Sequence, residues 1–206
     1  VLSNNDGCVI ARSEEAKLLG IRMGDPAFLV RDLIAKHDIQ VFSSNYVLYG
    51  DISERVMQNL GRWFPMVVPY SIDECFAWAA GIKSLYAHAV KARAAIVQNT
   101  GIPVSIGIGP TKTLAKVANK LAKKNDGVFI LDTKDKISKA LASFPVEDLW
   151  GIGRQYYKMI AQLGIETVGQ LRDMPEMWFK NNMTVQGQRL YKELWGIPML
   201  SIGDPP

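Results

Sequence analysis

The sequence predicts an α+β fold, in which helices pack on one face of an antiparallel sheet, followed by an all-helical segment. Three observations predict this fold class. Short apolar runs with strand character alternate with amphipathic helical stretches up to about residue 134. Turn-forming Gly, Pro, Asn and Asp residues separate these stretches. Beyond that point the strand signals end, and short helices with Gly and Pro breaks follow.

The N-terminal stretch predicts two short strands and a helix. A polar turn at Asn4–Gly7 separates two strands within residues 1–10, because Asn and Asp followed by Gly favour tight turns. Ser13 is expected to cap a short helix that ends at Gly20. Residues 24–26, Gly-Asp-Pro, then break the chain.

The middle of the chain predicts a small sheet with its helices. Apolar residues at helical spacing predict helices within residues 44–63 and after Ser84, which is expected to be an N-cap. Residues 66–79 predict a β-hairpin. A strand at 104–108, a helix at 111–123 and a strand at 128–131 follow. The two expected apolar stripes are Tyr49, Ile52, Val56 and Leu60 in the first helix, and Ala87, Val90, Ala94 and Val97 in the second.

Composition excludes several classes of protein. With 206 residues, 48% apolar and 21% charged, the chain is globular. We expect neither a signal peptide nor the roughly 20-residue apolar run of a membrane helix, and the two cysteines fit a reduced, cytoplasmic protein. Cys8 and Cys75 make no disulfide framework, and the isolated His37 and His88 argue against a zinc site. The net charge of +4 permits a polyanion partner.

Asp73 and Glu74 are the leading candidates for metal ligands. They interrupt the apolar run of the predicted hairpin, where a charged pair is unfavourable unless something compensates it. Hard divalent cations bind carboxylate oxygens, and two such ions about 3.5–4 Å apart are a common device for phosphoryl transfer. Both carboxylates reach a metal only where the backbone turns, because adjacent side chains of a strand point to opposite faces. The alternative is an exposed hairpin turn without a ligand.

The predicted helix at 111–123 carries lysines along one face, at the spacing i, i+4, i+8, i+11, and no acidic residue. Like charges at i, i+4 repel, so this face is either solvated or lies along an anion. The absence of interspersed Glu favours the anion. The helix also follows Gly107–Pro110, and its N-terminal backbone N–H groups suit a phosphate. The four lysines are Lys112, Lys116, Lys120 and Lys123.

Residues 149–153, Leu-Trp-Gly-Ile-Gly, predict a tight turn between two helices. The glycines leave backbone N–H groups open, and Ile152 is expected to anchor the turn in the core. A second Gly-Ile at 164–165 precedes a helix with Thr167 as its N-cap. This arrangement is a helix-hairpin-helix, whose amides hold a DNA phosphate without reading sequence. The alternative is a structural turn between helices.

The acid pair, the lysine-rich helix and the Gly-Ile-Gly turn, in this order, resemble the Y-family translesion DNA polymerases. Residues 3–12, 42–46 and 149–154 bring the chain closer still to the UmuC branch, of the polymerase V type. The similarity extends over essentially the whole chain. It implies a small fingers subdomain with the adjoining palm edge at 1–43, an antiparallel-sheet palm at 44–133, and an all-α helix-hairpin-helix thumb at 134–206.

The resemblance also implies roles for the matching residues. Asp73 and Glu74 match two of three carboxylates that hold two Mg²⁺ ions and are therefore catalytic. Lys17 and Lys123 match cations that bind the nucleotide triphosphate. Glu14 stands where many members have a phosphate-binding tyrosine, so no such ligand is expected there. The residues expected to hold the DNA backbone are Lys112, Lys116, Gly151, Ile152 and Gly153.

The implied activity is that of an error-prone, lesion-bypass DNA polymerase of the bacterial SOS response, which adds deoxynucleotides to a primer 3′-hydroxyl. Its implied partners are primer-template DNA, dNTP, a sliding clamp and accessory SOS proteins, without a membrane. The first palm strand with the third carboxylate, and the little-finger domain, are expected outside these 206 residues. We therefore expect the chain by itself to be inactive.

Three other functions remain open, and for one of them, a protein-interaction scaffold, the sequence offers no supporting feature. A non-catalytic DNA-binding module would use the helix-hairpin-helix and the basic helix. Its affinity would depend on salt but not on a metal at Asp73. A nucleotide cyclase or similar palm-type enzyme would use the acid pair, but it would leave the Gly-Ile-Gly turn without a role.

Overall fold

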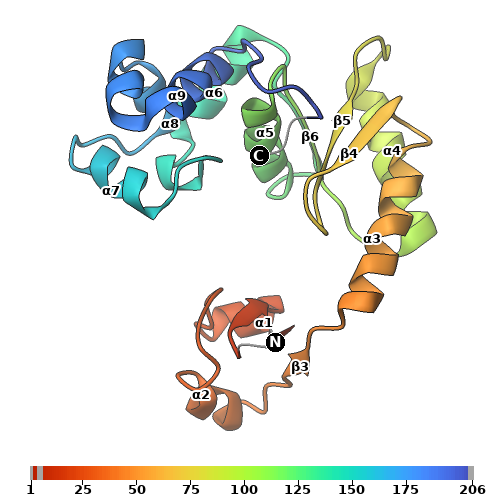
Figure 1. Ribbon diagram of the computed structural model, residues 1–206. Coiled ribbons are helices and arrows are strands. Elements are labelled where there is room, and N and C mark those ends of the chain that lie inside the picture. The colour runs from red at the N-terminus through yellow and green to blue at the C-terminus, as the bar shows by residue number, and fades with distance from the viewer. Residues whose placement is uncertain (1, 4–6, 204–206) are drawn as a thin grey trace. The chain divides into compact units, whose positions relative to one another are not determined.

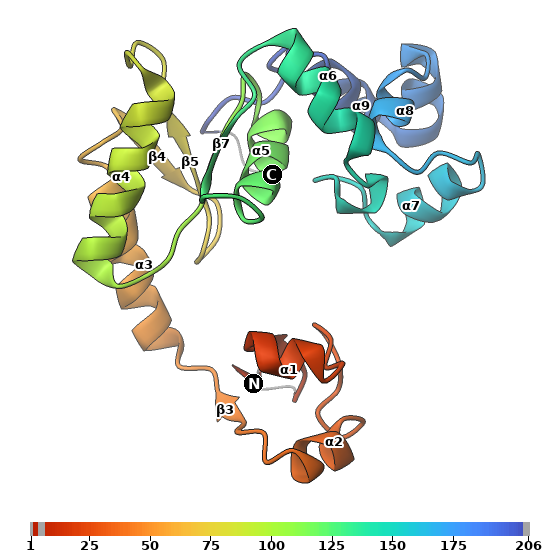
Figure 2. The ribbon, with the colours of Figure 1, turned by 180° about the vertical axis from the view of Figure 1, so that it is seen from behind.

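The computed structural model describes residues 2–3 and 7–203, and it divides the chain into two compact units, Val1–Asp51 and Ile52–Pro206 (Figures 1 and 2). The division falls inside helix α3 (Tyr46–Leu60). Within the described ranges, no helix combines the length and the apolar character that crossing a membrane requires. The predicted subdomain boundaries at 43/44 and 133/134 stay predictions.

Unit 1 contains a small sheet and two short helices. Strand β1 pairs antiparallel with β2 and parallel with β3. The helix predicted after Ser13 is present, and the Ser13 hydroxyl accepts a hydrogen bond from the Ala16 N–H (3.4 Å), which confirms the N-cap. The predicted turn at Asn4–Gly7 lies outside the described residues, except for Gly7. The elements are β1 (Leu2–Ser3), β2 (Val9–Ala11), α1 (Glu14–Leu18), α2 (Arg31–Lys36) and β3 (Phe42–Ser43).

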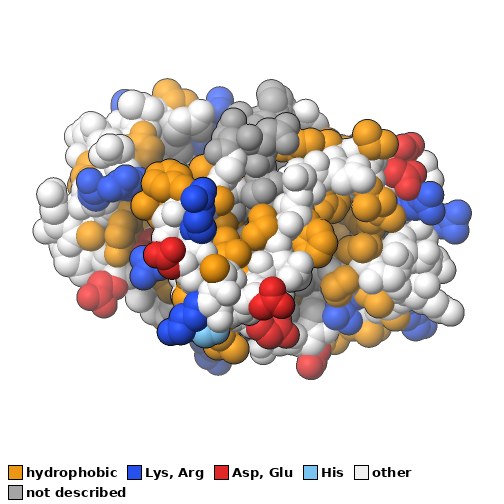
Figure 3. All heavy atoms as spheres, turned by 90° about the horizontal axis from the view of Figure 1, so that it is seen from below, with side chains coloured by type: hydrophobic (Ala, Val, Ile, Leu, Met, Phe, Trp, Pro, Cys, Tyr) orange, Lys and Arg blue, Asp and Glu red, His pale blue; other side chains and the backbone are white. Residues whose placement is uncertain are grey.

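The core of unit 1 is small, because only Val9, Ala16 and Ile21 are fully buried hydrophobics among its described residues. Many large apolar side chains remain exposed, including Phe28 and Leu29. Figure 3 shows hydrophobic side chains interspersed with charged ones over the face that it presents.

Unit 2 begins with the C-terminal part of α3 and continues with two strand pairs and two further long helices. The predicted hairpin forms, with Met66 opposite Trp78 and Pro69 opposite Cys75. Strands β6 and β7 pair in parallel, because helix α5 connects them as a crossover. The α+β class is confirmed, although the parallel pair was not predicted. The elements are β4 (Met66–Pro69), β5 (Cys75–Trp78), α4 (Leu85–Thr100), β6 (Ile106–Ile108), α5 (Lys112–Ala122) and β7 (Val128–Ile130).

Helix α4 turns a different face to the core than the sequence predicts. Ala89, Ala92 and Ile96 are buried, whereas Val90 of the predicted stripe is exposed. Nor does Ser84 cap the helix, because it adopts a left-handed conformation without a side-chain hydrogen bond. Two polar residues share the inner side: His88 Nε2 lies 2.7 Å from the Trp63 carbonyl oxygen, and Arg93 Nε donates to that of Val104 (2.9 Å). Apolar periodicity therefore misidentified the buried face.

The C-terminal part of unit 2 is helical, as predicted. The Thr167 cap is confirmed, with a reciprocal hydrogen bond from the N-cap backbone to the Gln170 side chain. Thr184 interrupts the last helix with φ 58° and ψ −150°. This part shares one hydrophobic core with Leu114 and Val117 of α5. The elements are α6 (Lys134–Ser143), the 3₁₀ helix η1 (Val146–Asp148), α7 (Arg154–Ala161), α8 (Val168–Arg172) and α9 (Glu176–Leu194).

Candidate functional site

The acid pair lies in the turn between β4 and β5, as predicted. The backbone N–H groups of Tyr70 and Ser71 both donate to the Glu74 carbonyl oxygen (2.9 and 3.0 Å), which closes the turn. The Ser71 hydroxyl donates to Asp73 Oδ1 (2.6 Å). The Asp73 side chain is exposed and that of Glu74 is partly buried. The backbone turn that the metal hypothesis requires is therefore present.

Lys116 of α5 binds the second acid of the pair. Its Nζ lies 2.7 Å from both carboxylate oxygens of Glu74 and 5.4 Å from the centre of the Tyr70 ring. One turn later Lys120 forms an ion pair with Asp148 of η1. Two lysines on this face of α5 thus form ion pairs with acids from two other segments of the chain. The sequence argument for an external anion overlooked these acids, because they are distant in sequence.

The N-terminus of α5 binds a carboxylate that belongs to the chain itself. The N–H of Thr113 donates to Glu193 Oε2 (3.0 Å), and that of Leu114 donates to the hydroxyl of the N-cap Thr111 (3.2 Å). The expectation that this N-terminus faces a phosphate was therefore wrong. Gly107, in the strand before this helix, has a packing role. A Cβ added to it would lie 2.0 Å from the Asn119 backbone nitrogen.

The Gly-Ile-Gly turn lies next to the acid-bearing hairpin. Trp150 Nε1 donates to the Tyr70 hydroxyl (3.2 Å), and their ring centres are 5.8 Å apart. Ile152 is buried in the core as predicted, and its N–H donates to the Leu149 carbonyl oxygen (3.0 Å). Ile152 therefore anchors the turn and has no spare amide for a phosphate. Gly151 has φ +91°, and a Cβ added to it would meet nothing within 4 Å.

A cavity of about 320 Å³ separates the hairpin turn from the C-terminal helices. Aromatic side chains of Tyr70 and Trp150 line it together with the cationic Lys112 and Arg189. Gly151 of the turn also lines it. The cavity combines positive charge, aromatic surface and accessible backbone, which suits contact with a phosphate backbone.

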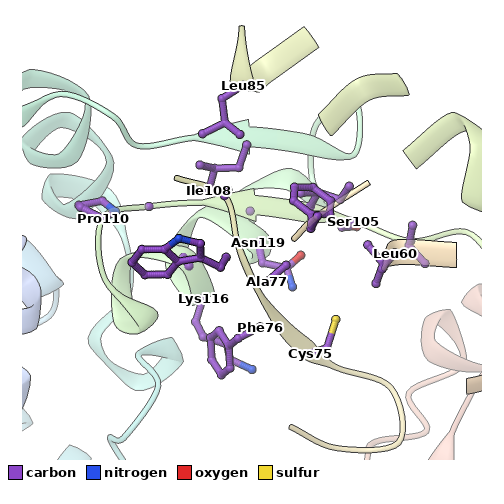
Figure 4. A pocket seen from close by; sticks show the side chains of 18 of the residues that line it. Leu60, Cys75, Phe76, Ala77, Leu85, Ser105, Ile108, Pro110, Lys116 and Asn119 are labelled. Atoms are coloured by element: carbon purple, nitrogen blue, oxygen red, sulfur yellow. The ribbon is translucent and has the colours of Figure 1, made fainter. Parts of the chain in front are cut away.

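A second, mostly apolar groove of about 380 Å³ lies between β5 and β6. The two strand pairs β4–β5 and β6–β7 are separate sheets among the described residues, and residues of both line the groove. Figure 4 shows Phe76 and Cys75 of β5 with Lys116 and Asn119 of α5 along this groove. Burial, together with the smaller effect of the adjacent Glu74 carboxylate, raises the pKa of the Cys75 thiol to about 11.

The two lysines predicted to bind triphosphate lie in different units. Lys17 belongs to unit 1 and forms an ion pair with Glu14, the residue found in place of the family's tyrosine. Lys123 is exposed at the C-terminal end of α5. Lys112 lies near the other end, with its Nζ 5.0 Å from the centre of the Phe76 ring. The predicted ligand roles of these lysines stay predictions.

The donor chemistry of the acid pair fits a magnesium ion. Mg²⁺ is commonly held by one or two carboxylates together with water and substrate phosphates, and Asp73 and Glu74 supply two adjacent carboxylates. Among residues 2–3 and 7–203, no three or more His, Cys, Asp or Glu side chains gather into a larger metal cluster. The donor chemistry of Asp73 and Glu74 thus fits the metal, and their role as its ligands stays a prediction.

Sequence reasoning missed several residues that shape this site. Glu193 and Asp148 looked like ordinary helix carboxylates, and no local signal distinguishes them. The contact between Trp150 and Tyr70 joins residues 80 positions apart. A Trp directly before the Gly-Ile-Gly turn is the one signal that would have suggested a packing partner.

Sequence comparisons identify relatives along the whole chain. UmuC of Salmonella typhimurium is 43% identical over 98% of this chain and 50% of its own length. DNA polymerase IV of Pelotomaculum thermopropionicum is 33% identical over 93% of this chain and 48% of its own. The chain thus spans about half the length of the curated relatives it matches.

Solved structures share the fold. A chimera of the Y-family DNA polymerases Dbh and Dpo4 matches with a TM-score of 0.82 over 100% of this chain and 62% of its own, at 20% identity. DinB from Sulfolobus solfataricus matches with a TM-score of 0.76 over 94% of this chain and 58% of its own, also at 20% identity. The impB/mucB/samB family matches residues 1–120, which is more than half of the 206 residues, and the chain therefore belongs to this family.

Proposed function

We propose that the gene product containing these residues is a template-dependent DNA polymerase that tolerates damaged templates. The observation that carries the proposal is the acid pair at the turn of a β-hairpin, bordered by a basic helix and a Gly-Ile-Gly turn. The names of the relatives, UmuC and DNA polymerase IV, support the same activity. Its substrates are primer-template DNA and dNTP, and it acts in the bacterial cytoplasm.

The proposal assigns metal binding, triphosphate binding and DNA-backbone binding to different groups of residues. Asp73 and Glu74 hold divalent metal, which when bound activates the primer 3′-hydroxyl and neutralises the triphosphate and the leaving pyrophosphate. Lys17 and Lys123 bind the triphosphate. The turn at Gly151 and Gly153 holds the DNA backbone, with Ile152 as its anchor. Lys112, at the wall of the adjacent cavity, supplies positive charge to the same strand. A sliding clamp and accessory SOS proteins are the proposed partners.

Primer extension with the complete gene product tests the activity. Asp73→Asn and Glu74→Gln should each reduce extension on undamaged DNA by at least about a hundredfold, the scale for loss of a group that stabilises developing charge. Asp135→Asn is the matched control, because this exposed acid forms an ion pair with Lys139 on the surface of α6. A template with an abasic site tests lesion bypass. Extension that survives both acid-pair substitutions would refute the proposal.

The open Gly-Ile-Gly turn also suits a DNA-binding module without chemistry. That function predicts DNA binding with a steep salt dependence and no extension at any metal concentration. Under both functions we expect the Asp73→Asn variant to bind DNA with the same affinity as the unsubstituted protein. Only metal-dependent extension therefore separates the two.

A further inference from the structure

We propose that Lys116 is a positioning residue that holds Glu74 while no metal is bound, and that a divalent ion gains Glu74 only by displacing this ammonium. The inference rests on the proposed function, in which the acid pair holds metal. It assigns Lys116 a role at the metal site in addition to the expected contact with DNA.

Both side chains of the Lys116–Glu74 ion pair are largely shielded from solvent. The Nζ of Lys116 contacts both oxygens of Glu74 at 2.7 Å, with the two side chains 21% and 29% exposed. By contrast, the Lys139–Asp135 pair is 77% and 72% exposed. Screening by solvent weakens exposed pairs and affects partly buried ones less. The Lys116–Glu74 contact is therefore a specific competitor for any cation that approaches Glu74.

The two acids of the turn consequently differ in their availability. Asp73 is exposed and accepts a hydrogen bond from the Ser71 hydroxyl, a neutral donor. Glu74 has both oxygens on the ammonium of Lys116. Asp73 would therefore be available to a divalent ion without any exchange, and Glu74 would become available once its carboxylate leaves Lys116.

The exchange requires only side-chain movement. The Glu74 backbone carbonyl remains fixed by the N–H groups of Tyr70 and Ser71. In the ion pair the ammonium already lies 5.4 Å from the centre of the Tyr70 ring, so a cation–π contact is within its reach after release. Once free, Lys116 lies beside the acid pair as a cation for an anionic group. Lys116 thus holds Glu74 in the metal-free state, and after the exchange its ammonium can bind a phosphate group.

Titration with Mn²⁺ alone tests the exchange, because the EPR signal of the free ion disappears on binding. Lys116→Met keeps most of the side-chain length and removes the charge, so it should bind Mn²⁺ about tenfold more tightly, the repulsion expected from a unit charge several ångströms from a divalent ion. Lys116→Arg keeps the charge and should bind Mn²⁺ with the same affinity as the unsubstituted chain. Lys120→Met removes an equal charge one turn away, where the partner is Asp148, and should change the affinity much less.

Three results would overturn the inference. They are unchanged or weaker Mn²⁺ binding in Lys116→Met, an equal gain in Lys120→Met, and a gain in Lys116→Arg. Lys116→Gln provides a second neutral variant, and circular dichroism checks that each variant is folded.

Asp73→Asn separates this inference from the proposed function. If Asp73→Asn leaves Mn²⁺ binding unchanged, the acid pair is not the metal site and both proposals fail. If it abolishes binding while Lys116→Met has no effect, only the exchange fails.

Discussion

The Glu193 carboxylate near the end of α9 accepts a hydrogen bond from the backbone N–H of Thr113 at the start of α5 (3.0 Å). Its other oxygen accepts from the N–H of Met199 (2.7 Å). The Thr111 hydroxyl donates to the Glu193 carbonyl oxygen (2.9 Å). Although Glu193 is charged, its exposure is 0%. A helix N-terminus stabilises a buried negative charge of this kind through its dipole and its unpaired N–H groups.

Replacing Glu193 by Gln should lower the free energy of unfolding by about 2–3 kcal/mol. The amide oxygen can replace one acceptor, but the NH₂ group would face a backbone donor, and a buried unpaired donor is costly. Urea unfolding followed by circular dichroism measures the change. Glu147→Gln is the control, since Glu147 is exposed on η1 and should change stability little. If the two variants unfold at the same urea concentration, the buried carboxylate contributes nothing to stability.

Gly107→Ala should prevent β6 from packing on α5. An added Cβ would lie 2.0 Å from the backbone nitrogen of Asn119 and 2.5 Å from the carbonyl oxygen of Ala115, so the helix has to move away from the strand. We expect a loss of at least about 3 kcal/mol, at the upper end for overpacked sites.

Gly50→Ala is the matched control for Gly107→Ala. Gly50 lies inside α3, and its added Cβ would meet nothing within 4 Å. Ala favours the helix there by about 0.5–1 kcal/mol, so this variant should melt at a slightly higher temperature than the parent chain. A Gly107→Ala variant that melts at the parent temperature would contradict the packing role of the glycine.

Most features that depend on neighbouring residues were predictable from the sequence, although Ser84, predicted on the same grounds to be an N-cap, makes no side-chain capping hydrogen bond. Ser13 and Thr167 cap their helices as expected, because capping involves a side chain and a backbone group within three positions. The hairpin around Asp73 and Glu74 formed because strand patterns flank a polar turn. Ile152 is buried, as the apolar residue between two turn glycines suggested.

Features set by distant residues were not predictable. Lys116 meets Glu74 from 42 positions away, and Thr113 meets Glu193 from 80. A single sequence gives no sign that such residues become neighbours. The buried face of α4 was missed for a related reason. His88 and Arg93 satisfy backbone carbonyls on its inner side, so polarity and exposure do not coincide there.

The Cys75 thiol should resist alkylation at neutral and mildly alkaline pH. Its pKa is raised to about 11 by burial first and by the Glu74 charge second. Because the thiolate is the reactive form, iodoacetamide should label Cys75 in a Cys8→Ser background about a hundredfold more slowly at pH 8 than a free thiol. The raised pKa favours the folded state fully below the ordinary thiol value and loses that contribution as the pH rises toward 11. Rapid labelling at pH 8, measured by mass spectrometry, would contradict this burial.

Trp150 and Tyr70 should stabilise the molecule as a coupled pair, because the indole N–H donates to the tyrosine hydroxyl between the Gly-Ile-Gly turn and the hairpin (3.2 Å). Trp150→Phe and Tyr70→Phe each remove that hydrogen bond while keeping an aromatic ring, so each should lower the free energy of unfolding by about 1 kcal/mol. The double variant should cost less than the sum of the two, with a coupling energy of at least about 0.5 kcal/mol by thermal or urea unfolding. Trp78→Phe controls for loss of indole area at a half-exposed site of β5. Strict additivity of the two substitutions would mean that the turn and the hairpin are held together by the surrounding core alone.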